Sequence, residues 1–182
     1  VKYADYALGK FIDRARTSDY WADTVLMVVA DHDTRVYGDE LVPVSKFHIP
    51  GVILGADIAP RQIDSVVSQI DLAPTLLSLL GVDSEHPFPG RDLTRTLTEF
   101  GNASPGVRPR AMMQFDQNFA WLEQDRLTVL LPNGHSRDFM YDRQSRELEP
   151  ATDSDLEAAR QALANVLMAD WLYREQRYRI AP

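Results

Sequence analysis

The 182-residue chain has no cysteine and fewer basic than acidic residues. The lack of cysteine excludes a disulfide framework, an iron–sulfur cluster, a Cys-based zinc finger and a cysteine nucleophile. The 27 acidic and 19 basic residues give a net charge of −8. That balance opposes the phosphate-neutralising mode of nucleic-acid binding, so we expect no nucleic-acid partner.

Long apolar runs are also missing, and the longest, Val25–Ala30, is far too short to cross a bilayer. With 45% hydrophobic and 25% charged residues, the composition is that of a globular protein. The chain opens with Val1 and enters a predicted helix at once, so we expect it to be a piece of a longer protein.

The first ninety residues have the pattern of an α/β core. Apolar residues at helical spacing predict an amphipathic helix over 3–16. The run Thr24–Ala30 is rich in β-branched residues, which is typical of a strand buried on both faces in a parallel sheet. A second, shorter strand is predicted over 49–54. A helix is predicted over 65–81, with Asp71 as its N-cap and Gly81 just past its end.

The second half predicts a different architecture. Proline and glycine over 91–110 indicate a connection between a first part, 1–90, and a second part, 111–182. Short strands are expected at 111–115, 119–123, 127–131 and 138–141. Asn133-Gly134 predicts a type I′ hairpin turn between the last two of these strands.

A long helix is predicted over 154–173, with Ser154 and Glu157 as a capping box. Its packed side is expected to consist of Leu156, Ala159, Leu163, Val166, Leu167 and Trp171. The expected fold class is therefore α/β, with a small antiparallel sheet and a long C-terminal helix.

Asp31 and His32 directly follow the first predicted strand, where open α/β sheets bind their ligands. A carboxylate beside an imidazole suits zinc or manganese better than calcium or magnesium, although zinc needs further donors. One alternative is that Asp31 caps a turn and His32 is an ordinary hydrogen-bonded residue. Another is an acid/base pair, which adjacent residues form only at a turn, because an extended backbone points them apart.

Three further residues are candidates for substrate binding. Arg35 and Lys46 lie in the loop after this pair, where either can engage a phosphate or sulfate oxygen. His48 precedes the second predicted strand. The alternatives are solvated loop charges for Arg35 and Lys46, and a satisfied core residue for His48.

Several motifs taken together resemble a known family. The chain resembles the sulfatase-like branch of the alkaline phosphatase superfamily in three segments, Tyr6–Ile12, Asp23-Thr24 and Ala30-Asp31-His32. Within it, the lipoteichoic acid synthase (phosphoglycerol transferase) group is similar at Arg35–Gly38, His48–Pro50 and Ser68–Leu77. The carboxy-terminal strand and acidic turn of sulfatase-like enzymes are similar to Phe139–Asp142 followed by Glu147–Glu149.

The resemblance implies the carboxy-terminal part of an alkaline phosphatase-like domain, in a metal-dependent enzyme acting on phosphate or sulfate esters. Asp31 and His32 match the family's Asp-His metal pair, for Mn, Zn, Mg or Ca. The family's Thr, Ser or modified Cys nucleophile has no counterpart here. We therefore expect no catalytic residue in this chain, and no turnover by the chain alone.

Within the family, a phosphoglycerol transferase fits the motifs best. The alternatives are an arylsulfatase-type sulfuric ester hydrolase and a non-catalytic α/β binding domain. The resemblance also implies a parent protein anchored in the cytoplasmic membrane, with this domain on the periplasmic or extracellular side. Because a partial sheet leaves an unpaired edge, we expect the chain to self-associate or to cover that edge with a loop.

Overall fold

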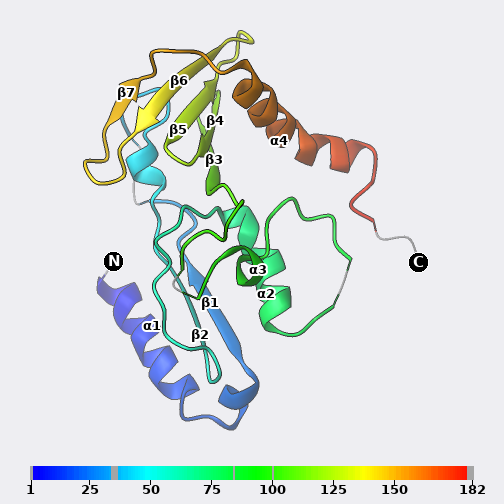
Figure 1. Ribbon diagram of the computed structural model, residues 1–182. Helices are drawn as coiled ribbons and strands as arrows, with labels where there is room; N and C mark the ends of the chain where they lie inside the picture. Colours follow the sequence, from blue (N-terminus) through cyan, green and yellow to red (C-terminus); the bar gives the residue numbers. More distant parts are fainter. Residues whose placement is uncertain (1, 34–36, 84, 100, 180–182) are drawn as a thin grey trace. The chain divides into compact units, whose positions relative to one another are not determined.

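The computed structural model describes residues 2–33, 37–83, 85–99 and 101–179 (Figure 1). The chain forms two compact units. The first unit comprises Val1–Ala30 and Pro50–Pro60, and the second comprises Asp31–Ile49 and Arg61–Pro182. The predicted boundaries at residues 90 and 110 stay a prediction.

The first unit contains the helix α1 (Lys2–Ala15), the 3₁₀ helix η1 (Asp19–Asp23), and the strands β1 (Val25–Val29) and β2 (Gly51–Gly55). The predicted helix and both predicted strands are thus confirmed. The strands pair antiparallel, with Val25 opposite Gly55 and Val29 opposite Gly51, and both are only partly buried. The predicted parallel, fully buried strand is therefore wrong. An apolar run identifies a strand, but it does not encode the direction of its neighbour.

The helical part of the second unit contains η2 (Val44–Phe47), η3 (Gln69–Asp71), α2 (Leu72–Leu79) and the short α3 (Leu93–Thr96). Gly81 has φ of 67°, and the amides of Gly81 and Val82 donate to the carbonyls of Ser78 and Leu77. This is the Schellman ending that the glycine predicted.

Asp71 occupies the N-cap position of α2, as predicted, but the expected capping by its side chain is absent. Its side chain accepts no capping hydrogen bond from α2. It reaches back to the amide of Ser68, where it completes a capping box on η3, and it binds the guanidinium of Arg110. Sequence spacing shows a carboxylate near a helix start, but it does not show a cation that arrives from 39 residues away.

The rest of the second unit is a five-stranded antiparallel sheet in the order β3–β4–β5–β6–β7, followed by α4. The strands are β3 (Arg110–Phe115), β4 (Asn118–Glu123), β5 (Arg126–Leu130), β6 (Ser136–Tyr141) and β7 (Leu148–Pro150). The four predicted strands are confirmed, and β7 is an addition that the sequence pattern did not predict.

The turn between β5 and β6 differs in type from the prediction. Gly134 has φ of 79°, but Asn133 does not have a positive φ, as a type I′ turn requires. The amide of Gly134 donates to Leu131, and Leu131 in turn donates to His135. The turn is therefore a longer loop with one left-handed glycine, which the proline at position 132 favours.

One face of this sheet packs against the segment that follows Asp31 and His32. Val42 and Val44 are buried in the same cluster as Met113, Leu122 and Leu127. The Asn118 side chain on β4 donates a hydrogen bond of 2.9 Å to the carbonyl of Leu41. The sheet therefore anchors residues 41–44, which precede His48.

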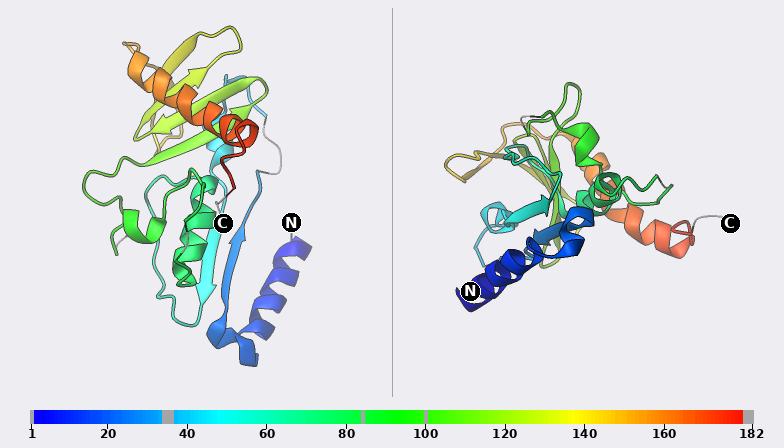
Figure 2. Two further views of the ribbon diagram at one scale, coloured as in Figure 1. Left: turned by 90° about the vertical axis from the view of Figure 1, so that its right-hand side faces the viewer. Right: turned by 90° about the horizontal axis from the view of Figure 1, so that it is seen from below.

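Helix α4 (Leu156–Arg174) packs on β4 and β5, as the views in Figure 2 show. Ala162 is its fully buried residue, whereas Leu156, Leu163, Leu167 and Trp171 are exposed. The predicted packed side is therefore wrong at these four residues, whereas its other two members, Ala159 and Val166, are half-buried. The less exposed side of the helix carries Ala158, Ala159, Ala162 and Val166, and periodicity alone did not choose between the two sides.

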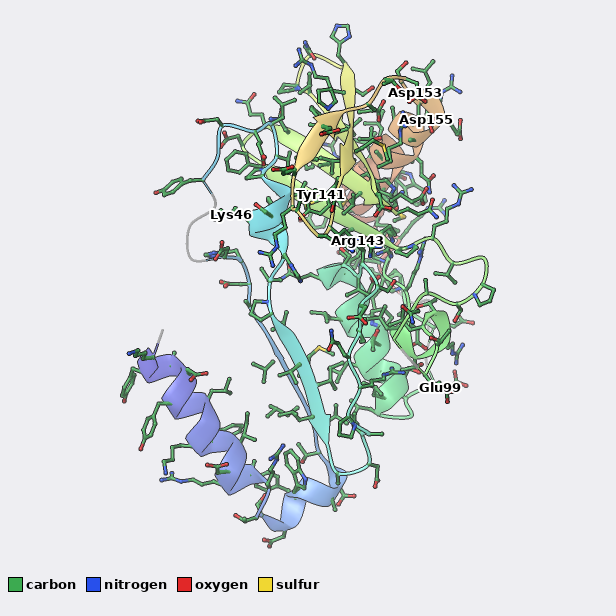
Figure 3. The ribbon with its side chains drawn as sticks, turned by 60° about the vertical axis from the view of Figure 1, so that its left-hand side comes forward. Lys46, Glu99, Tyr141, Arg143, Asp153 and Asp155 are labelled. Carbon is green, nitrogen blue, oxygen red and sulfur yellow. The ribbon has the colours of Figure 1, made fainter. Side chains whose placement is uncertain are left out.

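The cap of α4 is also shifted by one residue from the prediction. Asp155, not Ser154, accepts hydrogen bonds from the amides of Glu157 and Ala158, at 3.0 and 2.9 Å. Figure 3 shows Asp153 and Asp155 together at the start of this helix. The bonds to the two amides, chiefly that of Ala158, lower the pKa of Asp155 despite some desolvation.

Asp155→Ala should therefore lower the free energy of unfolding, because two amides of the first turn lose their acceptor. Ser154→Ala is the matched control and should leave stability unchanged. Urea unfolding followed by circular dichroism measures both. Equal losses in the two variants, or a loss only in Ser154→Ala, would restore the predicted capping box.

Among the described residues, every helix is too short or too polar to cross a membrane.

Candidate metal centre

The side chains of Asp31 and His32 face each other at a bend after β1. The Nε2 atom of His32 lies 3.5 Å from Oδ2 of Asp31. The other carboxylate oxygen, Oδ1, accepts a hydrogen bond of 2.9 Å from the His32 amide. Because the backbone leaves the extended conformation here, the objection that adjacent residues point apart does not apply.

The imidazole is held in one orientation. Its Nδ1 lies 2.6 Å from the carbonyl oxygen of Asp33 and donates its hydrogen to it, which leaves Nε2 as the nitrogen that can bind a cation. The hydrogen bond to Asp33 raises the pKa of His32, and the Asp31 carboxylate raises it further. A proton therefore competes with any other cation for Nε2, and cation binding weakens as the pH falls through this raised pKa.

The two donors fit part of a metal shell. A neutral imidazole nitrogen and a carboxylate oxygen, both largely exposed, are the ligand types of zinc and manganese sites. The 3.5 Å separation is close to that of two donors on a tetrahedral ion with bonds of about 2.1 Å. Within the described ranges, no three or more His, Cys, Asp or Glu side chains come together to hold an ion. The pair therefore supplies two ligands of an incomplete shell.

A third residue at this site was missed by the sequence reasoning. The Gln69 side chain donates a hydrogen bond of 3.1 Å from Nε2 to the carbonyl oxygen of Asp31. Gln69 lies on η3, at the start of the motif Ser68–Leu77, so its place in that motif was the available signal. It fixes the backbone from which the carboxylate projects.

Two of the three substrate-binding candidates, His48 and Lys46, lie among the residues that the structure describes. His48 ends η2 and is exposed, and it belongs to no metal-binding group with Asp31 and His32 among the residues that the structure describes. Lys46, labelled in Figure 3, is exposed on η2. Arg35 lies outside the described residues. The roles of Arg35 and His48 stay predictions.

Comparison with known proteins supports the family resemblance. Residues 1–82 match the Sulfatase family model. Arylsulfatase K from Xenopus laevis is 30% identical over 112 residues, which cover 57% of this chain and 21% of the relative. The lipoteichoic acid synthase-like protein YvgJ from Bacillus subtilis is 28% identical over 109 residues, which cover 47% of this chain and 16% of the relative. The chain thus spans about a fifth of these curated relatives.

Solved structures show the same fold. A crystal structure of a protein in the alkaline phosphatase superfamily from Vibrio parahaemolyticus aligns with a TM-score of 0.87 and 46% identity. It covers 99% of this chain, which spans 42% of that protein. The structure of BT4656 in complex with its substrate D-glucosamine-2-N,6-O-disulfate aligns with a TM-score of 0.55 and 16% identity, covering 95% of this chain and 39% of that one.

The second of these likenesses concerns the fold alone, whereas the first extends to the sequence of nearly the whole chain. Together with the match over residues 1–82, they confirm the predicted resemblance and fold class: the chain carries a sulfatase-family region and has the fold of the alkaline phosphatase superfamily.

Proposed function

We propose that this chain supplies part of the metal centre of an enzyme that acts on phosphate or sulfate esters. The observation that carries the proposal is the pairing of Asp31 and His32, with Nε2 and Oδ2 only 3.5 Å apart and the imidazole oriented by Asp33. The sulfatase-family match supports a hydrolase or a transferase as the reaction class.

When bound, a divalent metal in such a site activates the nucleophile and balances the charge that develops on the ester. The residues of this chain have simpler tasks. Asp31 and His32 hold the ion, while the Asp33 carbonyl fixes the ring and Gln69 fixes the backbone of Asp31. The ion is Mn, Zn, Mg or Ca, and the nitrogen donor favours the first two.

Transfer of phosphoglycerol is the reaction that we favour, and hydrolysis of a sulfuric ester is the alternative. Both kinds of name occur among the relatives, an arylsulfatase and a lipoteichoic acid synthase-like protein. The motifs Arg35–Gly38 and His48–Pro50 favour the transferase.

We propose that turnover needs a nucleophile outside this chain, so the chain alone should hydrolyse neither nitrophenyl phosphate nor nitrophenyl sulfate with added Mn²⁺. Activity abolished by Asp31→Ala would refute that part of the proposal.

The parent protein, we propose further, is anchored in the cytoplasmic membrane and carries this domain on its outer side in the cell envelope. The support is the lipoteichoic acid synthase-like relative and the resemblance to its group.

Self-association through the β1–β2 sheet is a separate proposal, supported by its partly exposed strands. Size-exclusion chromatography over a range of concentrations tests it, and a strictly monomeric chain would refute it.

The metal centre predicts a specific thermal effect. Mn²⁺ or Zn²⁺ at ten times its Kd should stabilise the chain by about 1.4 kcal/mol and raise the Tm by a few degrees. Asp31→Ala and His32→Ala should each abolish that shift, because each removes one of two donors. The measurement is a metal titration of the melting temperature at a pH where His32 is neutral.

Two matched controls keep this test sharp. Asp39→Ala and His135→Ala change an exposed carboxylate and an exposed imidazole of the same unit, so the metal-induced shift should persist in both. A shift that survives Asp31→Ala, or no shift in the unchanged chain, favours the non-catalytic binding domain instead.

A further inference from the structure

A hollow on the surface of the second unit has two arginines and one carboxylate among its lining residues, none of which belongs to the candidate metal centre. Its volume is about 350 Å³, a size that suits a small ligand. The loop residues Arg91, Arg108 and Gly106 line it, together with Glu123 from β4 and Gln161 from α4. All of them belong to the second unit.

The charges around this hollow do not balance. Among its lining residues, the two arginines Arg91 and Arg108 meet one carboxylate, Glu123, while the neighbouring Arg110 is neutralised by Asp71. Arg110 pairs with Asp71, at 2.8 Å between Nη2 and Oδ1. Arg108 pairs with Glu123, at 3.3 Å between Nη1 and Oε2. Arg91 has no carboxylate within ion-pair distance in the described parts of the chain, although the net charge of the whole chain is −8.

The guanidinium of Arg91 is also partly removed from water. Its one hydrogen bond to protein among the described residues runs from Nη1 to the carbonyl of Arg108, at 2.6 Å, so its other N–H groups remain available. Partial burial lowers the pKa of Arg91, and the charge of Arg110 lowers it further. A desolvated cation beside a second cation is stabilised when an anion binds.

The hydrogen bond from Arg91 to the Arg108 carbonyl also brings these two arginines together. The Arg91 guanidinium thus contacts the backbone of Arg108, and both residues line the same hollow. Planar forks of N–H donors match the oxygens of phosphate and sulfate, and the Gln161 amide on the opposite element adds a neutral donor. Glu123 is the one carboxylate on this wall among the described residues, and it opposes anion binding.

We propose that this hollow is a binding site for a phosphate or sulfate group, held by Arg91 and Arg108. It is independent of the Asp31–His32 pair, so it stands whether or not that pair binds metal. The oxyanion is either a free inorganic ion or the charged end of an ester, and the chemistry of recognition is the same for both.

The test is a binding titration of the whole chain with inorganic phosphate, inorganic sulfate and glycerol 3-phosphate. It is run with EDTA present and at constant ionic strength, so that the metal centre plays no part. Isothermal titration calorimetry or ³¹P NMR measures Kd. An ester that binds at least tenfold more tightly than inorganic phosphate identifies the ester as the ligand, and similar constants identify the free ion.

Four variants decide the outcome. Arg91→Gln and Arg108→Gln should each weaken binding by about tenfold or more, since each removes charged hydrogen-bond donors. Glu123→Gln should strengthen it, because the opposing carboxylate is gone. Arg95→Gln should change nothing, because Arg95 is not among the residues that line the hollow and pairs with Asp92.

The arginine variants and Glu123→Gln are expected to change the affinity in opposite directions. The proposal can therefore still be refuted if one variant fails to fold, and circular dichroism shows whether it does. The proposal is overturned if phosphate, sulfate and glycerol 3-phosphate bind no more tightly than chloride does. Binding that Arg91→Gln and Arg108→Gln both retain, or that Arg95→Gln loses equally, overturns it too.

Discussion

Asp71→Asn should lower the free energy of unfolding by about 3–5 kcal/mol, the largest effect that we expect from one side chain. The Asp71 and Arg110 side chains are 2% and 4% exposed. They share two hydrogen bonds, 2.8 and 3.0 Å long, and Arg110 also lies 5.8 Å from the centre of the Trp121 ring.

The carboxylate serves four donors at once. Besides the guanidinium, it accepts the amide of Ser68 at 3.0 Å and the amide of Arg91 at 2.7 Å. It thereby ties η3, the loop before α3 and the first residue of β3 to one another. An asparagine of the same shape cannot accept at both ends, so it leaves a buried guanidinium uncompensated.

Urea unfolding followed by tryptophan fluorescence measures the loss. Asp125→Asn is the matched control, because its pair with Arg143 is about half exposed and should contribute no more than about 1 kcal/mol. If Asp71→Asn costs no more than this control, the buried pair does not hold these elements together.

Gly101→Ala should also be strongly destabilising, and Gly106→Ala isolates the reason. Both glycines have positive φ, 76° and 82°, so alanine at either position pays the same conformational cost of about 1 kcal/mol. A Cβ on Gly101 would also lie 2.0 Å from the carbonyl oxygen of Gln62, whereas nothing lies within 4 Å of a Cβ on Gly106.

The clash cannot be relieved by rotating a side chain, because the obstacle is backbone. The two segments are joined by the Ser65 amide, which donates to the Gly101 carbonyl at 3.4 Å. We therefore expect Gly101→Ala to lose a further 1–3 kcal/mol, roughly, relative to Gly106→Ala. If the two variants unfold with the same m-value, the difference between their urea midpoints measures the cost of the clash. Equal losses would mean that the segments separate freely.

Local patterns predicted the elements of this fold well, and long-range partners explain where they failed. The periodicity of α1 and α4 and the runs of β1 to β6 depend on neighbouring residues, so they were visible in the sequence. Three features depend on contacts between residues far apart in the sequence: the direction of β2, the partner of Asp71 and the buried side of α4. Apolar residues at helical spacing occurred on two sides of α4, and only the sheet selected the side that carries Ala162.

The candidate site was predicted to the same extent. Asp31 and His32 were found because they follow a strand and match a family pair. Their convergence depends on a bend and on the Asp33 carbonyl, which no spacing encodes. Gln69 escaped notice because its contact with Asp31 spans 38 residues. The uncompensated charge of Arg91 was invisible, since it depends on which carboxylates the other arginines take.

Paramagnetic NMR on the chain with ¹⁵N-labelled histidine tests the central claim, shared coordination of one cation by Asp31 and His32. With substoichiometric Mn²⁺, the ring signals of His32 should broaden first, while those of His86 and His135 persist. The selectivity should vanish in Asp31→Asn. Broadening of His32 no greater than that of the other histidines, or unchanged by Asp31→Asn, would contradict the claim.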